Sequence, residues 1–302
     1  MAAPLFRRMA LLGVGLIGGS MSLAARRGGL VGEIVGHAKS ERTRARALEL
    51  GLCAKMYDNP ADAARDADLV VLATPVGAYA ALAAAIAPVL KPGTIVTDVG
   101  SVKAAVVADV LPHMPPGVDF VPAHPVAGTE HSGPDAGFAE LFDNRWTILT
   151  PPEGTRLEAT EKLAAFWRAL GAKVDIMTPP HHDLVLAVTS HLPHLIAYNI
   201  VGTANHLEAV TESEVIKYAA GGFRDFTRIA ASDPVMWRDI FLTNGGAVLE
   251  MLGRFQEDLS VLTRAIRFKD GETLEKFFTH TRAIRRGVID AGQADPETAK
   301  KK

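Results

Sequence analysis

Cysteine is nearly absent from this sequence: Cys53 is the only one among 302 residues. The chain therefore cannot form an internal disulfide or a thiolate metal cluster, and we expect no metal. It also lacks long runs of like charge, since 32 basic residues are balanced by 34 acidic ones, for a net charge of −2. Without a charged footprint for nucleic acid or membranes, the expected partner is a small molecule. The cysteine content fits a reducing compartment, and the cytoplasm is our default.

Long apolar runs are missing as well. No segment reaches the roughly 18 uninterrupted apolar residues that a transmembrane helix needs. Arg7-Arg8 followed by the apolar run from Met9 to Ala25 superficially imitates a secretory signal. Four glycines interrupt that run, whereas a signal peptide favours a continuous apolar helix. We therefore expect neither a signal peptide nor a membrane span here.

What the first 178 residues contain is an alternation of short apolar runs with helix-length amphipathic segments, typical of βαβ units around a mostly parallel sheet. We predict strands at 9–12, 33–36, 55–57, 68–74, 94–98, 119–122, 146–150 and 173–177. Predicted helices at 16–27, 41–50 and 79–90 stop at glycine-containing signals. The predicted fold class is α/β, with an N-terminal Rossmann-type dinucleotide-binding domain at 1–178.

After Thr178 the strand-like runs vanish, and we predict an all-α domain at 179–302 for substrate binding and dimerisation. Ser232-Asp233-Pro234 predicts the start of a helical segment that runs to about Arg267, with a possible break at Gly245-Gly246. Apolar residues lie on more than one face of these helices, so they must be covered on several sides. We expect a homodimer through this domain; a compact monomeric bundle is the alternative.

The glycine pattern Gly13-Val-Gly15-Leu-Ile-Gly18 follows a predicted strand and opens a predicted helix. A dinucleotide site needs such glycines for a tight turn and for close approach of the backbone to a pyrophosphate, which the helix amides then bind. We assign cofactor contacts to Gly13, Gly15, Leu16, Ile17 and Gly18, and to Thr74 and Pro75 at the end of a later strand.

The choice between NAD and NADP stays open. About twenty residues past the glycine loop, an NAD site commonly carries an acid that binds the ribose hydroxyls, and none stands there. His37, Lys39, Ser40 and Arg42 can form a pocket for a 2'-phosphate, or they can be ordinary solvated side chains.

His124 follows the predicted strand 119–122, so we expect it at the carboxyl edge of the sheet, near a nicotinamide ring. A neutral imidazole there can take a hydroxyl proton while hydride leaves the same carbon. Ser101 is predicted to start a helix. Its hydroxyl can cap that helix, orient His124, or do both.

In the helical half, His191 and His194 have a spacing that can hold a metal, but no third ligand accompanies them and Pro193 distorts the helix. We expect one histidine to face substrate and the other to be packed. Arg228 is a candidate anchor for a substrate carboxylate; an ion pair with Asp225 or Glu130 is the alternative.

With these motifs assembled, the chain resembles the prephenate/arogenate (cyclohexadienyl) dehydrogenase family of tyrosine biosynthesis over nearly its whole length. The motifs occur in the family's order: Gly13-x-Gly15-x-x-Gly18, Asp98-Val-Gly-Ser101-Val-Lys103, His124-Pro-Val-Ala-Gly-Thr-Glu130-x-Ser132-Gly133, Ser190-His-Leu-Pro-His194, Gly222-Phe-Arg-Asp225-Phe-Thr-Arg228 and Asp233-Pro-Val-Met-Trp237. The departure is at His37, where NAD-preferring members usually carry an acid. We expect a single-activity enzyme without a fused mutase or regulatory domain.

The resemblance implies an NAD(P)-dependent oxidative decarboxylation of prephenate or arogenate. It implies that His124 accepts the proton of the ring hydroxyl, and that Ser101 orients His124 and contacts the nicotinamide side. By the same resemblance, His194 and Arg228 hold substrate oxygens. Among the remaining expected site residues, Glu130 belongs to a polar network near the entrance, and Thr129 and Gly221 shape the pocket.

Two other functions remain as alternatives. One is a β-hydroxyacid dehydrogenase, which joins the same two domain types but depends on a lysine in the helical part, where Lys217 is the only obvious candidate. The other is a nucleotide-sensing module that has the fold without catalysis, because fold alone does not establish function. The joint presence of Ser101, His124 and Arg228 argues against the second.

Overall fold

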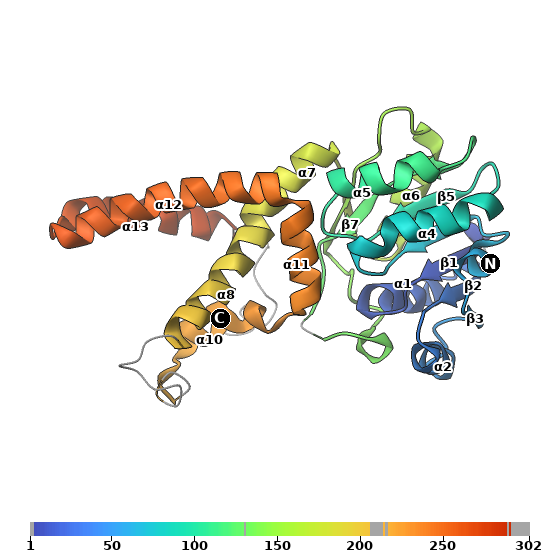
Figure 1. Ribbon diagram of the computed structural model, residues 1–302, viewed down its shortest axis with the longest axis horizontal. Helices are drawn as coiled ribbons and strands as arrows, with labels where there is room; N and C mark the ends of the chain where they lie inside the picture. The colour runs from blue at the N-terminus through green and yellow to red at the C-terminus, as the bar shows by residue number, and fades with distance from the viewer. Residues whose placement is uncertain (1–2, 130, 206–213, 215–216, 289, 291–302) are drawn as a thin grey trace. The chain divides into compact units, whose positions relative to one another are not determined.

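The computed structural model describes residues 3–129, 131–205, 214, 217–288 and 290 (Figure 1). Its contacts divide the chain into two compact units, Met1–Val248 and Leu249–Lys302. The first unit contains the sheet and the helices as far as the beginning of α12, and the second contains a helical pair. The domain boundary expected at 178/179 therefore stays a prediction.

A six-stranded parallel sheet organises the first unit. Its strands are β1 (Phe6–Leu12), β2 (Val31–His37), β3 (Lys55–Tyr57), β4 (Leu69–Leu72), β5 (Ile95–Asp98) and β6 (Asp119–Phe120). Their order is β3-β2-β1-β4-β5-β6, and every neighbouring pair is parallel. The order reverses between β1 and β4, which is where doubly wound sheets bind their ligands. The predicted Rossmann-type fold is confirmed.

Alternating side chains on the strands build a core on each face of this sheet. Met9, Leu11, Leu69 and Val71 belong to one buried cluster, whereas their neighbours Ala10, Leu12, Val70 and Leu72 belong to the other. Helices α1 (Leu16–Arg27) and α6 (Leu157–Ala169) cover the first face. Helices α3 (Pro60–Ala64), α4 (Tyr79–Ile86) and α5 (Ala104–Val110) cover the second. The shorter helix α2 (Glu41–Glu49) follows β2.

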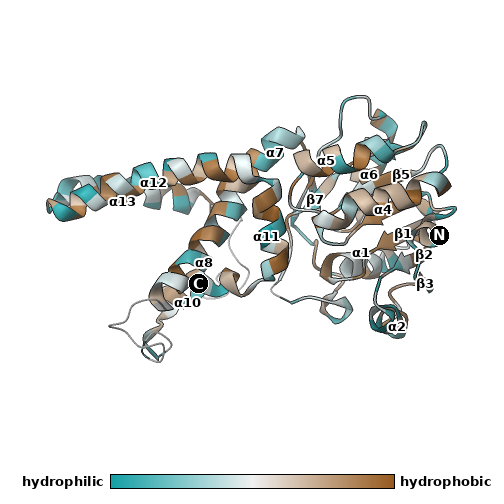
Figure 2. Ribbon diagram, in the orientation of Figure 1, coloured by the Kyte–Doolittle hydropathy of each residue, from teal (hydrophilic) through white to brown (hydrophobic). Residues whose placement is uncertain are grey.

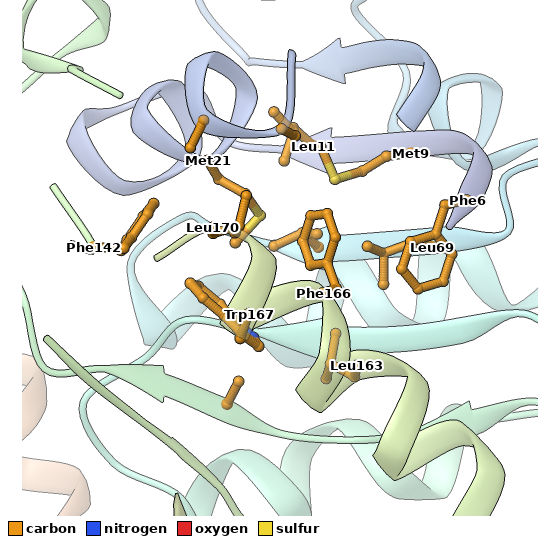
Figure 3. Packing of buried hydrophobic residues seen from close by; sticks show 14 of the residues in the cluster. Phe6, Met9, Leu11, Met21, Leu69, Phe142, Leu163, Phe166, Trp167 and Leu170 are labelled. Carbon is orange, nitrogen blue, oxygen red and sulfur yellow. The ribbon is translucent and has the colours of Figure 1, made fainter. Parts of the chain in front are cut away.

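Aromatic rings fill the first of these cores (Figure 3). Phe6 of β1 meets Phe166 of α6 edge to face, with ring centroids 5.5 Å apart and planes at 85°. Phe142 meets Trp167 in the same way at 5.2 Å and 84°. These four side chains are at most 1% exposed. Aromatic pairs of this geometry add stability beyond the area they bury, so α6 is firmly attached to the sheet.

A second sheet of three strands lies beyond β6 and contains the predicted catalytic histidine. Its strands are β7 (Ala123–Pro125), β8 (Trp146–Leu149) and β9 (Lys173–Ile176), with β7 antiparallel to β8 and β8 parallel to β9. We predicted one strand over 119–122 with His124 just past it. That was wrong in part. The ladder to β5 ends at Val121, whose amide donates to the Val96 carbonyl, because the next amide in register, that of Ala123, donates to the Asp98 side chain instead. The Pro122 carbonyl accepts from Thr150 N at 2.9 Å, and His124 becomes the central residue of β7.

A helical part follows the second sheet within the same unit. Helix α7 (Pro179–Leu186) continues through a π-helical turn, η5 (Ala187–His191), into α8 (Leu192–Asn205). Pro193 cannot donate a helical hydrogen bond, which accounts for the wide turn just before it. The stretch Pro179–Ala204 is long and apolar enough to span a membrane. It nevertheless carries fully buried, hydrogen-bonded histidines, as a core helix can.

Two more helices of this part lie among the described residues: α10 (Gly221–Thr227) with the 3-10 turn η6 (Arg228–Ala231), and α11 (Pro234–Thr243). Asp233 caps α11, accepting from the amides of Val235 at 2.8 Å and Met236 at 2.9 Å. The predicted helix start is confirmed, and so is the break, because α11 ends at Thr243 and α12 (Gly245–Arg267) begins anew.

The second unit consists of the remainder of α12 and helix α13 (Gly271–Val288). Asp270 caps α13 by accepting from the amide of Thr273 at 3.0 Å. Apolar residues recur along both helices (Figure 2), and many are exposed: Leu249, Leu259, Val261, Ile266, Phe278 and Ile284. The basic cluster formed by Arg282, Arg285 and Arg286 is solvent-exposed.

A buried ion pair ties the two sheets together. Lys103 Nζ donates to Asp98 Oδ2 at the end of β5 and, at 2.8 Å, to the carbonyl of Ala123 in β7. Asp98 Oδ1 accepts from the Ala123 amide at 3.2 Å. Both charged side chains are 0% exposed. Burial raises the pKa of Asp98 and lowers the pKa of Lys103, while each partner's charge opposes those shifts.

Replacing Lys103 should show how strongly the fold depends on this pair. Lys103→Met leaves Asp98 buried without a partner, so we expect the free energy of unfolding in urea to fall by about 3–5 kcal/mol. The matched control is Lys91→Met, whose partner Asp66 is exposed. That variant should change stability much less. Equal losses in the two variants would show that the buried pair has no special role.

Candidate active site

The predicted cofactor glycines lie at the edge of the sheet between β1 and α1. Gly13 has a φ of +111°, and a Cβ there would lie 2.4 Å from the carbonyl oxygen of Ala73. At Gly18 a Cβ would lie 2.3 Å from the Gly13 carbonyl oxygen, so this glycine permits close helix–strand packing. At Gly15, the N-cap of α1, a Cβ would meet nothing within 4 Å. The backbone is therefore open there to a close ligand.

Two further features of this edge suit a polar ligand. Leu16 and Ile17 open α1, and the amides of a first helical turn point outward toward an anion. Thr74 and Pro75 follow β4 beside the loop, and the buried Thr74 Oγ1 has no hydrogen-bond partner among the described residues. A buried hydroxyl in that condition is costly unless a ligand or water satisfies it. The residues present therefore fit a dinucleotide.

The four residues predicted to form a 2'-phosphate pocket differ in exposure. His37 is buried, with Nδ1 3.2 Å from the Tyr57 carbonyl, and burial lowers its pKa. Lys39 and Arg42 are exposed. Ser40 and Arg42 line a surface cavity of about 690 Å³. Arg44, which the sequence did not single out, donates to the carbonyls of Ala38 and Lys39 at 2.8 and 2.9 Å and holds this turn.

At the second sheet, His124 is part of a chain of three side chains. His124 is 7% exposed, and its Nδ1 lies 2.9 Å from Nε2 of His182 in α7. The Nδ1 of His182 lies 2.8 Å from Asp183 Oδ1. Two imidazoles and one carboxylate are thus connected end to end.

Asp183 also caps helix α5. Its Oδ1 accepts from the amide of Lys103 at 2.7 Å and its Oδ2 from the amide of Ala104 at 2.8 Å. The prediction that Ser101 starts this helix was wrong, because α5 begins at Ala104 and its amides are capped from α7. Ser101 is half-buried just before α5, and the structure shows no hydrogen bond between its hydroxyl and His124, both of which it describes.

Burial and neighbouring charges favour the neutral forms of His124 and His182. The pKa of His124 is held well below its ordinary value, first by burial and then by the positive charge of Lys103; a proton on His182 or His191 would lower it further. Burial also lowers the pKa of His182, which Asp183 opposes. Burial alone would raise the pKa of Asp183, but hydrogen bonds from His182 and the α5 amides bring it below the usual range. At neutral pH we therefore expect an ionised Asp183 beside two neutral histidines.

The two histidines of the helical motif differ in their surroundings. His191 is fully buried, its Nδ1 lies 3.1 Å from Asn244 Nδ2, and burial lowers its pKa to about 4. His194 is half-buried and stacks on Trp237 at a centroid distance of 3.7 Å. Trp237 is itself buried, at 6% exposed. His191 is thus the packed histidine and His194 the more accessible one.

Arg228, at the start of η6, is near His194. Burial lowers the pKa of His194, and the positive charge of Arg228 lowers it further. Gly221 is the first residue of α10, on the same segment. Thr129 is exposed, and its hydroxyl accepts from the His131 amide at 3.2 Å. Glu130 lies outside the described residues.

Sequence reasoning missed three residues of this site: His182, Asp183 and Asn244. Asn244 Nδ2 donates to the Asp183 carbonyl at 2.9 Å as well as contacting His191. One signal was available, since His181-His182-Asp183 follows directly on two prolines that start a helix. Because these titratable residues are adjacent and lie in the first turn of a helix at a predicted domain boundary, they could have been proposed as site residues.

Known proteins resemble this chain along most of its length. The family model described as the nucleotide-binding domain of prephenate dehydrogenase matches residues 21–176, and that of the prephenate dehydrogenase dimerization domain matches residues 178–280. The cyclohexadienyl dehydrogenase of Zymomonas mobilis is 43% identical, over 93% of this chain and 95% of its own. The prephenate dehydrogenase of Bacillus subtilis is 35% identical, over 92% and 75%.

Solved structures agree. Prephenate dehydrogenase from Aquifex aeolicus, in complex with hydroxyphenyl propionate and NAD+, superposes with a TM-score of 0.87 at 34% identity, over 93% of this chain and 98% of that one. Synechocystis arogenate dehydrogenase gives a TM-score of 0.77 at 27% identity, over 93% and 99%. The chain belongs to the prephenate dehydrogenase family.

Proposed function

We propose that this protein catalyses the oxidative decarboxylation of prephenate or arogenate in tyrosine biosynthesis, with transfer of a hydride to NAD or NADP. The products are 4-hydroxyphenylpyruvate or tyrosine, together with carbon dioxide. The observation that carries this proposal is the buried, neutral His124, held by a chain of hydrogen bonds in a unit that also contains an open dinucleotide loop. The family and its relatives support it.

The chemistry requires a proton acceptor but consumes no proton. Hydride leaves the ring carbon that carries the hydroxyl, and the hydroxyl proton must be accepted as that carbon becomes a carbonyl. Loss of the ring carboxylate as carbon dioxide then returns electrons to the ring, and the proton returns to what is now a phenolic oxygen. A neutral imidazole can accept and return this proton near pH 7.

The residues divide this work. His124 takes the hydroxyl proton with the ring nitrogen that does not contact His182. Ser101, just before α5, contacts the nicotinamide side of the cofactor in this proposal. When bound at the glycine loop, NAD or NADP supplies the hydride acceptor. Gly13, Gly15 and the first amides of α1 bind its pyrophosphate, and Thr74 gives a buried hydroxyl for a polar atom of the cofactor.

The anionic substrate needs a cation, and the proposed anchor is Arg228 with His194 beside it. A guanidinium offers a planar pair of donors to a carboxylate. The nearby positive charge also disfavours protonation of His194, which leaves that histidine a neutral hydrogen-bonding group. Thr129, Glu130 and Gly221 shape the entrance in this proposal.

The same proposal makes the protein a cytoplasmic homodimer. The family model over residues 178–280 is that of a dimerization domain. Exposed apolar side chains recur on α12 and α13, where a second copy can cover them.

The alternative function, a β-hydroxyacid dehydrogenase, gains no support, because Lys217 is exposed and its Nζ lies over the ring of Tyr218 at 5.2 Å.

The direct test incubates the purified protein with prephenate or arogenate and with NAD or NADP, and follows reduced nicotinamide. We expect turnover with at least one of the four pairs. His124→Asn should lower kcat by about 10² or more, because general-base assistance is lost. Cofactor affinity, measured by fluorescence, should stay nearly unchanged. Folded wild-type protein that turns over none of the pairs would refute the proposed function.

Arg228→Ala tests the anchor. Loss of a charged hydrogen bond to the substrate should raise KM by about tenfold or more while kcat changes less. Arg224→Ala is the matched control, since Arg224 is an exposed arginine on the adjoining helix. Steady-state kinetics give KM and kcat for both variants. An unchanged KM in Arg228→Ala would show that another residue binds the substrate carboxylate.

A further inference from the structure

We infer that His182 and Asp183 are positioning residues that hold His124 in the one tautomer able to accept the substrate proton. The last step of this inference rests on the proposed function, because it assigns a task to the free nitrogen of His124. The tautomer itself follows from the hydrogen bonds of a neutral His182 and does not depend on the proposed function.

The carboxylate of Asp183 determines where His182 carries its proton. An ionised carboxylate can only accept hydrogen bonds. Asp183 accepts from the amides of Lys103 and Ala104, and Oδ1 also contacts Nδ1 of His182 at 2.8 Å. The Nδ1 of His182 must therefore carry a proton.

The proton position on His182 in turn determines the proton position on His124. A neutral imidazole with its proton on Nδ1 has a lone pair on Nε2. The Nε2 of His182 lies 2.9 Å from Nδ1 of His124, so His124 must donate this hydrogen bond. The proton of neutral His124 is thus on Nδ1, and its Nε2 carries the lone pair. The carboxylate of Asp183, acting through His182, thus decides which nitrogen of His124 carries the proton.

A cationic His182 would reverse this outcome, because both of its nitrogens would then donate. The surroundings disfavour that cation. His182 is 0% exposed, and the positive charge of Lys103 acts against its protonation, while Asp183 and Asp98 act in favour. Burial is the largest of these influences, and it keeps His182 neutral. For His124, burial is the largest influence that lowers the pKa, the positive charge of Lys103 adds to it, and a proton on His182 or His191 would lower the pKa further.

The positions of the three residues are themselves fixed. Asp183 is held between the first turn of α5 and α7, and its own carbonyl accepts from Asn244. His124 lies on β7, which the buried Lys103 joins to β5. The same logic operates in serine proteases, where a buried aspartate fixes a histidine tautomer and its exchange for asparagine lowers kcat by about 10⁴. Here a second histidine lies between the carboxylate and the base.

The first test needs neither substrate nor cofactor. Nitrogen-15 NMR of the full-length protein, labelled at histidine, reports the proton position on each ring, with His124→Asn and His182→Gln for assignment. We expect His124 and His182 to be neutral from pH 8 to pH 6, each with its proton on Nδ1. A proton on Nε2 of His124, or a cationic His182 at pH 7, would overturn the inference.

The second test is kinetic and compares two substitutions of His182. Glutamine keeps an acceptor oxygen for the His124 proton, whereas leucine removes it. We expect His182→Leu to lower kcat by about 10² with KM within twofold, and His182→Gln to restore most of that loss. Thermal unfolding midpoints of both variants show whether the fold is kept.

The outcomes separate the two proposals. Equal losses of kcat in the leucine and glutamine variants, or a change in KM alone, would refute the positioning role. If the wild-type protein turns over neither substrate, the proposed function fails while the NMR experiment still decides the tautomer. Turnover by the wild type with the opposite tautomer would leave the proposed function standing and remove this inference.

Discussion

The active site depends on one buried carboxylate. Asp183 is almost entirely inside the protein, where an unpaired charge would be very costly, so it must be surrounded by donors. It receives hydrogen bonds from two amides of α5 and from His182. Those three donors determine the start of α5, the place of α7 and, through His182, the orientation of His124. The sheet, the helical part and the proposed catalytic base, His124, are thereby joined at a single group.

The second buried pair complements the first. Lys103 and Asp98 satisfy each other and the backbone of Ala123, so β7 is fixed one residue before His124. Lys103 also lowers the pKa of His124. The cation that stabilises the strand therefore helps to keep the base unprotonated. The proposed mechanism requires this, because His124 must be neutral before it can accept the substrate proton.

Local signals explain what the sequence could predict. The strand, Gly13 turn and α1 follow one another within about 30 residues and need only short-range contacts. The Asp233-Pro234 helix start is likewise local. The path of the chain after β6 depends on Pro122 pairing with a strand about 30 residues later, which residue spacing alone does not show.

His182 and Asp183 could not be predicted as site residues, because their contacts also join distant parts of the sequence. His182 meets His124 across 58 positions, and Asp183 meets Lys103 across 80. No local pattern connects these residues, and their pairing exists only after the helical part has packed on the sheet. Ser101 was assigned to a helix start because its type suits a cap. The actual cap is distant in sequence and close in space.

A double-mutant cycle on His124 and His182 tests the central claim most directly. If His182 acts only by orienting His124, its removal costs nothing once His124 is gone. The account predicts that the kcat of His124→Asn combined with His182→Leu equals that of His124→Asn alone, within about twofold. Losses that multiply, so that the double variant is slower by the product of the two single effects, would contradict it.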